Sequence, residues 1–213
     1  MDLSVFKNKI VYTFRKYAKQ ELCEKAGIHS YDVVYADILP EIYEYSTHMK
    51  KPVRIIEMGV NKGGSIMLWK ELFPDAFVIG IDTDISHVDE RCHQLDDIKF
   101  YVADQTDSRL VNFLELEGPF DLIIDNASHD PFKQMSSFYM LQRLLRPQGY
   151  YVIESVYPEN VYTHEFEEHF QKIDLRNIKN RGDDMVFLYQ SQKPKTIDLV
   201  FMPPESHSSF RVM

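Results

Sequence analysis

The stretch Arg54-Ile-Ile-Glu-Met-Gly-Val-Asn-Lys-Gly-Gly-Ser65 decides the fold of this chain. Together with the preceding Val53, its first residues as far as Met58 predict a short buried strand, because branched aliphatic residues sit together with no room for a solvated face. Three glycines, Gly59, Gly63 and Gly64, then stand where a backbone must bend sharply and come close to a ligand. Ser65 is expected to cap the helix that follows. The order of strand, tight turn and helix predicts the start of a βαβ unit.

A second apolar strand, Phe77 to Ile81, ends at Asp82, which lies 25 residues after Glu57. An acid at the end of the second strand of a βαβ unit typically accepts hydrogen bonds from ribose hydroxyls. This half of the chain is therefore expected to bind a nucleoside.

The glycine turn also indicates which nucleoside. Asn61 replaces the middle glycine that would let a pyrophosphate approach the backbone. Glu57 stands at the mouth of the turn, where a carboxylate repels phosphate and favours a cation. S-adenosylmethionine fits both features, because it carries adenosine, a sulfonium and an ammonium but no phosphate. The alternative is a glycine-rich turn without a ligand, and the spacing to Asp82 counts against it.

Composition restricts the class of partner. The chain has 213 residues and a net charge of −9, which argues against nucleic acid and favours a small-molecule substrate. Cys23 and Cys92 lack metal-ligand spacing and are expected to be free thiols of a reducing cytoplasm. We expect a cytoplasmic protein without membrane contact, since no leader peptide or membrane span is evident.

The order of the elements predicts a doubly wound α/β fold with a Rossmann-like sheet and helices on both faces. Residues 1–50 are expected to form an N-terminal helical cap, 51–192 the core of the single domain, and 193–213 a tail available for an oligomer contact. The predicted strands are Val53–Met58, Phe77–Ile81, Ile98–Val102, Phe120–Ile124, Gly149–Ile153 and Met185–Tyr189. Helices are expected over 131–145 and Glu165–Phe170.

Polar side chains follow the predicted strands, where ligands bind in doubly wound sheets. Asp104 and Gln105 are candidates for adenine binding, and a helix cap by Asp104 or Thr106 is the alternative. Further polar residues end the fourth and fifth strands, namely Asp125, Asn126, Ser128, His129, Glu154 and Ser155.

The ordered set of motifs resembles class I S-adenosylmethionine-dependent methyltransferases, in the group of macrolide-sugar and rhamnosyl O-methyltransferases and cephalosporin-hydroxylase-like proteins. The matching segments are His29-Ser-Tyr31, Ile56-Glu-Met-Gly-Val60, Gly63-Gly-Ser65, Trp69, Gly80-Ile-Asp82, Asp104-Gln-Thr-Asp107, Ile123-Ile-Asp-Asn-Ala-Ser-His129, Tyr151-Val-Ile-Glu-Ser155 and Arg181-Gly-Asp-Asp-Met185. Together with the strand-end pattern, the resemblance implies cofactor-binding roles for Tyr31, Glu57, Gly59, Asn61, Gly63, Gly64, Ser65, Asp82, Asp104, Gln105 and Asp125. It places substrate binding at Asn126, Glu154, Tyr157 and Arg181.

In sugar-modifying members of that family, Mg²⁺ is held at the positions that correspond to Asn126, Glu154 and Ser155. Two of the three acids are replaced here, so we expect weak or no metal binding.

The resemblance implies that His129 is the catalytic base, acting on a hydroxyl of a sugar or sugar nucleotide in a secondary-metabolite or surface-polysaccharide pathway. Two alternatives remain. An ionised phosphate or carboxylate acceptor would need no base, and a non-catalytic module would bind the cofactor without turnover.

Overall fold

The computed structural model describes residues 2–157, 159 and 162–192, and the predicted tail, 193–213, lies outside these residues. The helices are α1 (Leu3–Lys19), α2 (Glu24–Gly27), α3 (Asp32–Met49), α4 (Gly64–Leu72), α5 (Glu90–His93), α6 (Arg109–Glu117), α7 (Pro131–Leu141), the 3₁₀ turn η1 (Gln142–Leu144), α8 (His164–Glu168) and α9 (Arg176–Lys179). The strands are β1 (Arg54–Met58), β2 (Phe77–Asp82), β3 (Ile98–Val102), β4 (Phe120–Asp125), β5 (Leu145–Ile153), β6 (Gln171–Asp174) and β7 (Met185–Gln190).

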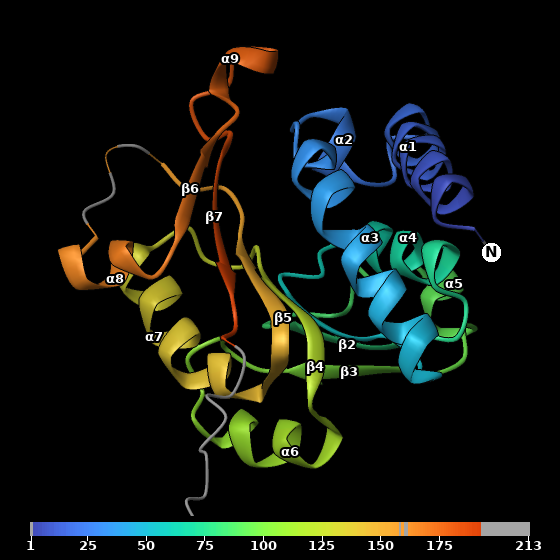
Figure 1. Ribbon diagram of the computed structural model, residues 1–213. Helices are drawn as coiled ribbons and strands as arrows, with labels where there is room; N and C mark the ends of the chain where they lie inside the picture. Colours follow the sequence, from blue (N-terminus) through green and yellow to red (C-terminus); the bar gives the residue numbers. More distant parts are fainter. Residues whose placement is uncertain (1, 158, 160–161, 193–213) are drawn as a thin grey trace, which may run out of the picture.

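The strands form one sheet in the order β3-β2-β1-β4-β5-β7-β6. Neighbours among β1 to β5 pair in parallel, whereas β7 runs antiparallel to both β5 and β6. The order reverses at β1, between β2 and β4, and such a reversal opens a crevice at the carboxyl ends of the strands. The predicted doubly wound α/β fold is confirmed (Figure 1).

Apolar side chains alternate between the two faces of the sheet, and helices cover each face (Figure 1). Ile55 packs on one face with α1, α3 and α4, and the adjacent Ile56 packs on the other with α6, α7 and α8. A strand buried on both faces reads as a continuous apolar run, which is why β1 was recognisable in the sequence.

The N-terminal helices share the core of the sheet domain. Phe14 of α1 and Tyr35 of α3 pack their rings 6.2 and 5.0 Å from that of Trp69 in α4. The turn between α1 and α3 is thereby held close to the carboxyl ends of β1, β4 and β5.

Among the described residues, no helix combines the length and apolar character that a membrane crossing requires.

One local expectation and one alternative were wrong, and one strand was missed. Ser65 does not cap α4, because the cap is Gly63, whose φ of 80° is strained for other residues. Asp104 and Thr106 do not cap α6, which begins after Ser108. The sequence reading also missed β6, an edge strand whose one apolar residue, Ile173, is half-buried. A single half-buried side chain leaves no period-two pattern to detect.

Cys23 and Cys92 are free thiols, as expected, and both are buried.

Candidate functional site

A cavity of about 560 Å³ opens at the carboxyl ends of the parallel strands, where a doubly wound sheet binds its ligand. A smaller cavity beside the glycine turn shares Glu24, Gly59, Asn61 and Asn126 with it, so the two are adjacent. The large cavity is lined by Glu24, His29, Met58, Gly59, Asn61, Ile81, Asp82, Thr83, Ala103, Asp104, Gln105, Asn126, Ala127, Ser128, His129, Lys133, Ser155, Arg181 and Asp183.

Asp82 ends β2 with its carboxylate at this cavity. The backbone N–H of Asn61 donates to Oδ2 of Asp82 at 3.0 Å, and the N–H of Asp84 donates to Oδ1 at 3.3 Å. These bonds fix the carboxylate beside the glycine turn and leave acceptor capacity on both oxygens. Asp82 is therefore placed as a nucleoside site requires.

Asp104 and Gln105 line the cavity next to Asp82, but protein groups occupy much of their hydrogen-bonding capacity. Asp104 accepts from the N–H and hydroxyl of Thr106 and from Nζ of Lys133 at 2.7 Å. The amide oxygen of Gln105 accepts the N–H of Ser128 at 2.7 Å, and its nitrogen donates to Asp125. Hydrogen bonds from Lys133 and Thr106 hold the pKa of Asp104 at about 2, so this carboxylate is ionised.

Asp125 is fully buried at the end of β4. It accepts hydrogen bonds from Gln105 at 2.8 Å and from the hydroxyl of Ser137 at 2.6 Å. No lysine, arginine or histidine among the described residues pairs with it. Burial without a cation raises the pKa of Asp125 to about 7, although the hydrogen bonds oppose the rise. Asp125 therefore braces the loop that carries Asn126 to His129.

A buried cation lies behind the cavity. Nζ of Lys25, from α2, is 2.5 Å from Oε2 of Glu154 and 3.1 Å from Oε1 of Glu57. Burial opposes the charge on Lys25, but the two carboxylates outweigh it and raise its pKa. Tyr35 donates to the other oxygen of Glu154 at 2.5 Å, and Trp69 Nε1 donates to Glu57 at 2.7 Å. The fully buried carboxylates of Glu57 and Glu154 are thus bound within the protein.

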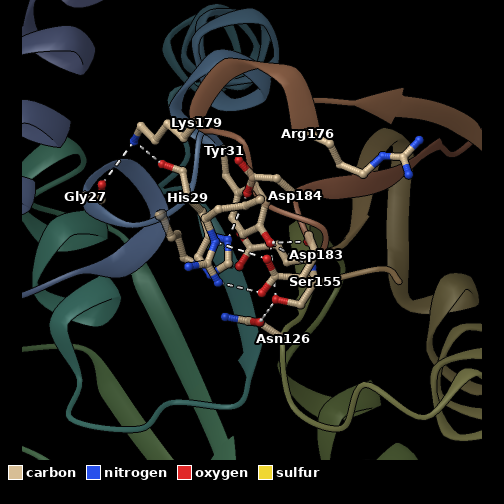
Figure 2. A network of polar contacts seen from close by, with 12 residues as sticks. Gly27, His29, Tyr31, Asn126, Ser155, Arg176, Lys179, Asp183 and Asp184 are labelled. Atoms are coloured by element: carbon tan, nitrogen blue, oxygen red, sulfur yellow. Dashed lines mark hydrogen bonds and ion pairs between the residues drawn. The ribbon is translucent and has the colours of Figure 1, made fainter. Parts of the chain in front are cut away.

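The three positions that correspond to a metal site do not fit a divalent cation. Both oxygens of Glu154 are taken by Lys25 and Tyr35. Asn126 Oδ1 accepts from the hydroxyl of Ser155 at 3.2 Å (Figure 2). Mg²⁺ demands octahedral coordination by free oxygen donors, usually including carboxylates. This donor set offers no free carboxylate oxygen.

His129 lies at the rim of the cavity after β4, and its ring centroid is 5.7 Å from that of Tyr157. Partial withdrawal from water lowers the pKa of His129, while the charge of Asp183 opposes that effect. The neutral imidazole, which can accept a proton, is therefore the dominant form at neutral pH.

A second imidazole enters the cavity from the turn between α2 and α3. Nδ1 of His29 lies 2.8 Å from Oδ1 of the buried Asp184, and its ring stacks on Tyr31 at 4.5 Å (Figure 2). Beside it, Arg181 donates to both oxygens of Asp183, at 3.0 and 2.7 Å. Burial acts against ionisation of Asp183, but the Arg181 bonds hold its pKa below the usual value.

One cavity brings together several of the predicted site residues, whose roles stay predictions: Gly59, Asn61, Asp82, Asp104, Gln105, Asn126, His129 and Arg181. Tyr31, Asp125 and Glu154 were also predicted to contact a ligand, and this stays a prediction. All three side chains are buried, none lines the cavity, and each binds neighbouring protein groups. Glu57 and Ser65 line only the small cavity. Tyr157 does not line the large cavity, but its ring contacts that of His129.

The reason for the glycines also differs from the expected one. A Cβ on Gly64 would lie 1.5 Å from the carbonyl oxygen of Leu22, and a Cβ on Gly63 would lie 2.5 Å from Sγ of Cys92. A Cβ on Gly59 would lie 2.1 Å from the carbonyl oxygen of Asn126. Close backbone or side-chain packing therefore excludes a side chain at all three positions.

Sequence reasoning did not assign Lys25, His29, Asp183 or Asp184 to the site. The sequence did contain a signal for His29, Asp183 and Asp184, because the segments 29–31 and 181–185 belong to the ordered motifs. Lys25 had no signal, since a lysine in a short polar turn is usually solvated.

A family model described as "methyltransferase domain" matches residues 49–197. The chain is 34% identical over 122 residues to a mycinamicin VI 2''-O-methyltransferase of Micromonospora griseorubida, covering 53% of this chain and 29% of the relative. It is 30% identical over 141 residues to an 8-demethyl-8-alpha-L-rhamnosyl tetracenomycin-C 2'-O-methyltransferase of Streptomyces olivaceus, covering 62% and 35%. The match thus spans about a third of these relatives.

Among solved structures, a chain of the fibrillarin/NOP5P complex superposes with a TM-score of 0.51 at 12% identity, covering 67% of this chain and 73% of that one. A likeness at this identity supports the fold alone.

Proposed function

We propose that this chain, which belongs to the methyltransferase-domain family, transfers a methyl group from S-adenosylmethionine to a hydroxyl of a small sugar or sugar nucleotide. The observation that carries the proposal is one cavity with a fixed ribose acceptor, Asp82, and a neutral imidazole, His129, in its wall. The names of the relatives, which give mycinamicin VI and a rhamnosyl tetracenomycin as the molecules methylated, support a sugar hydroxyl of a secondary metabolite as the acceptor.

The cavity suits the proposed cofactor. Asp82 would bind the ribose, and the adjacent small cavity beside Gly59 and Asn61 offers room for the methionine part. S-adenosylmethionine supplies an electrophilic methyl group on a cationic sulfur. The protein holds donor and acceptor in line and excludes water.

The charges around the cavity favour a neutral hydroxyl, and not an ionised phosphate or carboxylate oxygen, as the group that receives the methyl. Its wall carries four acids, Glu24, Asp82, Asp104 and Asp183. Its two permanent cations, Lys133 and Arg181, are already paired with Asp104 and Asp183. An ionised oxygen at the point of methyl transfer would be repelled by the uncompensated carboxylates, whereas the sulfonium is attracted to them and a neutral hydroxyl is not repelled.

A neutral hydroxyl has to lose its proton as the methyl group arrives. His129 lines the cavity as a neutral base and would accept that proton. Because Glu154 is bound by Lys25 and Tyr35, the mechanism needs no step through a metal.

Calorimetry with S-adenosylhomocysteine, followed by methyl-transfer assays on dTDP-L-rhamnose and methyl α-L-rhamnopyranoside, tests the proposal. A non-catalytic module would bind the cofactor and give no product. Asp82→Ala should weaken cofactor binding by about 1.5 to 3 kcal/mol, the usual range for hydrogen bonds to a charged group. Asp96→Ala, an exposed change away from the cavity, is the control. Equal affinity in the two variants would refute the ribose assignment.

A further inference from the structure

The ring of His29 is held in one orientation by contacts on two sides. Asp184, which is fully buried, binds Nδ1 at 2.8 Å, and Tyr31 stacks on the ring with an angle of 10° between planes. Tyr31 is itself fixed, since it accepts the N–H of Ser155 at 3.0 Å and donates to the carbonyl of Asp183 at 3.3 Å (Figure 2). Lys179 also donates to the carbonyl of His29.

The buried carboxylate determines which ring nitrogen carries the proton. A carboxylate accepts hydrogen bonds, so in the neutral imidazole Nδ1 of His29 is the N–H donor and Nε2 keeps its lone pair. The second oxygen of Asp184, Oδ2, has no hydrogen-bond partner among the described residues, so the ring is the group that orients this carboxylate. Asp184 is the partner of this ring within the described chain, and His29 lines the cavity. Nε2 is therefore a hydrogen-bond acceptor available to a ligand.

We propose that Nε2 of His29 accepts a hydrogen bond from a second hydroxyl of the acceptor, so that the site requires a polyhydroxylated ring and not an isolated alcohol. This inference rests on the proposed function. His29 lines the cavity from the α2–α3 turn, and His129 lines it from the segment after β4. Asn126, Ser155 and Asp183 supply further oxygen groups between them.

The role is one of specificity. His129 takes the proton of the hydroxyl that is methylated, and His29 binds a hydroxyl that keeps its proton. Asp184 is a positioning residue, because it acts only through the tautomer of His29. An acceptor without the second hydroxyl would leave the fixed Nε2 buried against ligand and unpaired, and a site of this kind discriminates against such an analogue.

The test compares methyl α-L-rhamnopyranoside with its 2-, 3- and 4-deoxy analogues in the wild type, His29→Ala and Asp184→Asn. In the wild type, at least one deoxy analogue that is still methylated should lose about 10- to 100-fold in kcat/KM, the effect of one unpaired polar group. In His29→Ala, the same pair of acceptors should differ by less than about threefold, because the group that distinguishes them is gone.

Asp184→Asn keeps the shape of the partner but lets an amide N–H donate to Nδ1, which moves the ring proton to Nε2. In Asp184→Asn, the ratio of kcat/KM between the two acceptors should fall as it does in His29→Ala. Nitrogen NMR of His29 should show the changed tautomer. His48→Ala, an exposed change on α3, should behave as wild type. Binding of S-adenosylhomocysteine confirms that each variant is folded.

If His29→Ala distinguished the rhamnoside from its deoxy analogue as strongly as the wild type does, the inference about His29 would be overturned and the proposed function would stand. An Nε2–H tautomer of His29 in the wild type would have the same consequence. A wild type that methylates neither the rhamnoside nor dTDP-L-rhamnose would overturn the proposed function and this inference with it.

Discussion

At the scale of single residues, Lys25 is a buried cation held between two buried carboxylates. Its side chain is 3% exposed, and its ammonium lies between Glu57 and Glu154. Lys25→Met should reduce the free energy of unfolding by about 3 to 5 kcal/mol, because removing one partner leaves buried carboxylates without a cation. Urea denaturation measures this loss.

The matched control is Lys16→Met, since Lys16 pairs with Glu71 at 2.7 Å in a partly exposed position. It should cost less than about 1 kcal/mol. Adding Glu154→Gln to Lys25→Met should recover part of the loss by removing one uncompensated charge. Equal effects of the two lysine changes would show that the buried triad contributes no more than a surface pair.

His129 belongs to the same scale. His129→Ala should lower kcat by about 10²- to 10⁴-fold on a neutral sugar hydroxyl, the usual range for general-base assistance, with cofactor affinity unchanged. Because the pKa of His129 is lowered, the acidic limb of the rate profile should lie below the ordinary imidazole value of about 6.5. Near wild-type kcat in the variant would contradict the role of this residue as base.

At the scale of elements, Asp125 joins the end of β4 to α7 through Ser137 and to the loop after β3 through Gln105. Its folded pKa of about 7 exceeds the unfolded value of about 3.9. Between these values the folded protein binds a proton that the unfolded chain releases, so the contribution of Asp125 to stability is lost as pH rises.

Relative to Asp125→Asn, the wild type should therefore lose about 2 to 3 kcal/mol of unfolding free energy between pH 5 and pH 7, at 1.36 kcal/mol for each pH unit. Urea denaturation at both values measures the difference. The comparison with the variant removes the contribution of the other acids. A difference that does not change with pH would mean that the buried carboxylate titrates normally.

The elements also show what the sequence could predict. β1 and β4 were recognisable because strands buried on both faces are continuous apolar runs. The place of Asp82 at the cavity followed from its position at a strand end, whereas the role proposed for His129 came from the family resemblance. The packing of Leu22 on Gly64 was not predictable, because it joins segments far apart in the chain and leaves no periodic signal. The burial of Asp125 and Glu154 could not be predicted from the sequence either, because their partners lie on other helices. These partners are Ser137, Lys25 and Tyr35.

At the scale of the whole molecule, the N-terminal helices and the sheet together determine the metal dependence of the site. Glu154 comes from β5, but its oxygens are bound by Lys25 of α2 and Tyr35 of α3. A divalent ion would have to displace a buried lysine and open the packing of α1 and α3 around Trp69. Methyl transfer should therefore persist in EDTA.

The measurement is kcat with dTDP-L-rhamnose after dialysis against EDTA, and then with added Mg²⁺. The two values should agree within about twofold, because Asn126 and Ser155 alone cannot supply the octahedral oxygen set that Mg²⁺ requires. Glu154→Gln serves as the companion variant. If Mg²⁺ did bind through this carboxylate, the variant would lose a metal-dependent rate, whereas the buried pair predicts a loss of stability without any metal effect. Abolished turnover in EDTA that Mg²⁺ restores would show that the buried network opens to admit an ion.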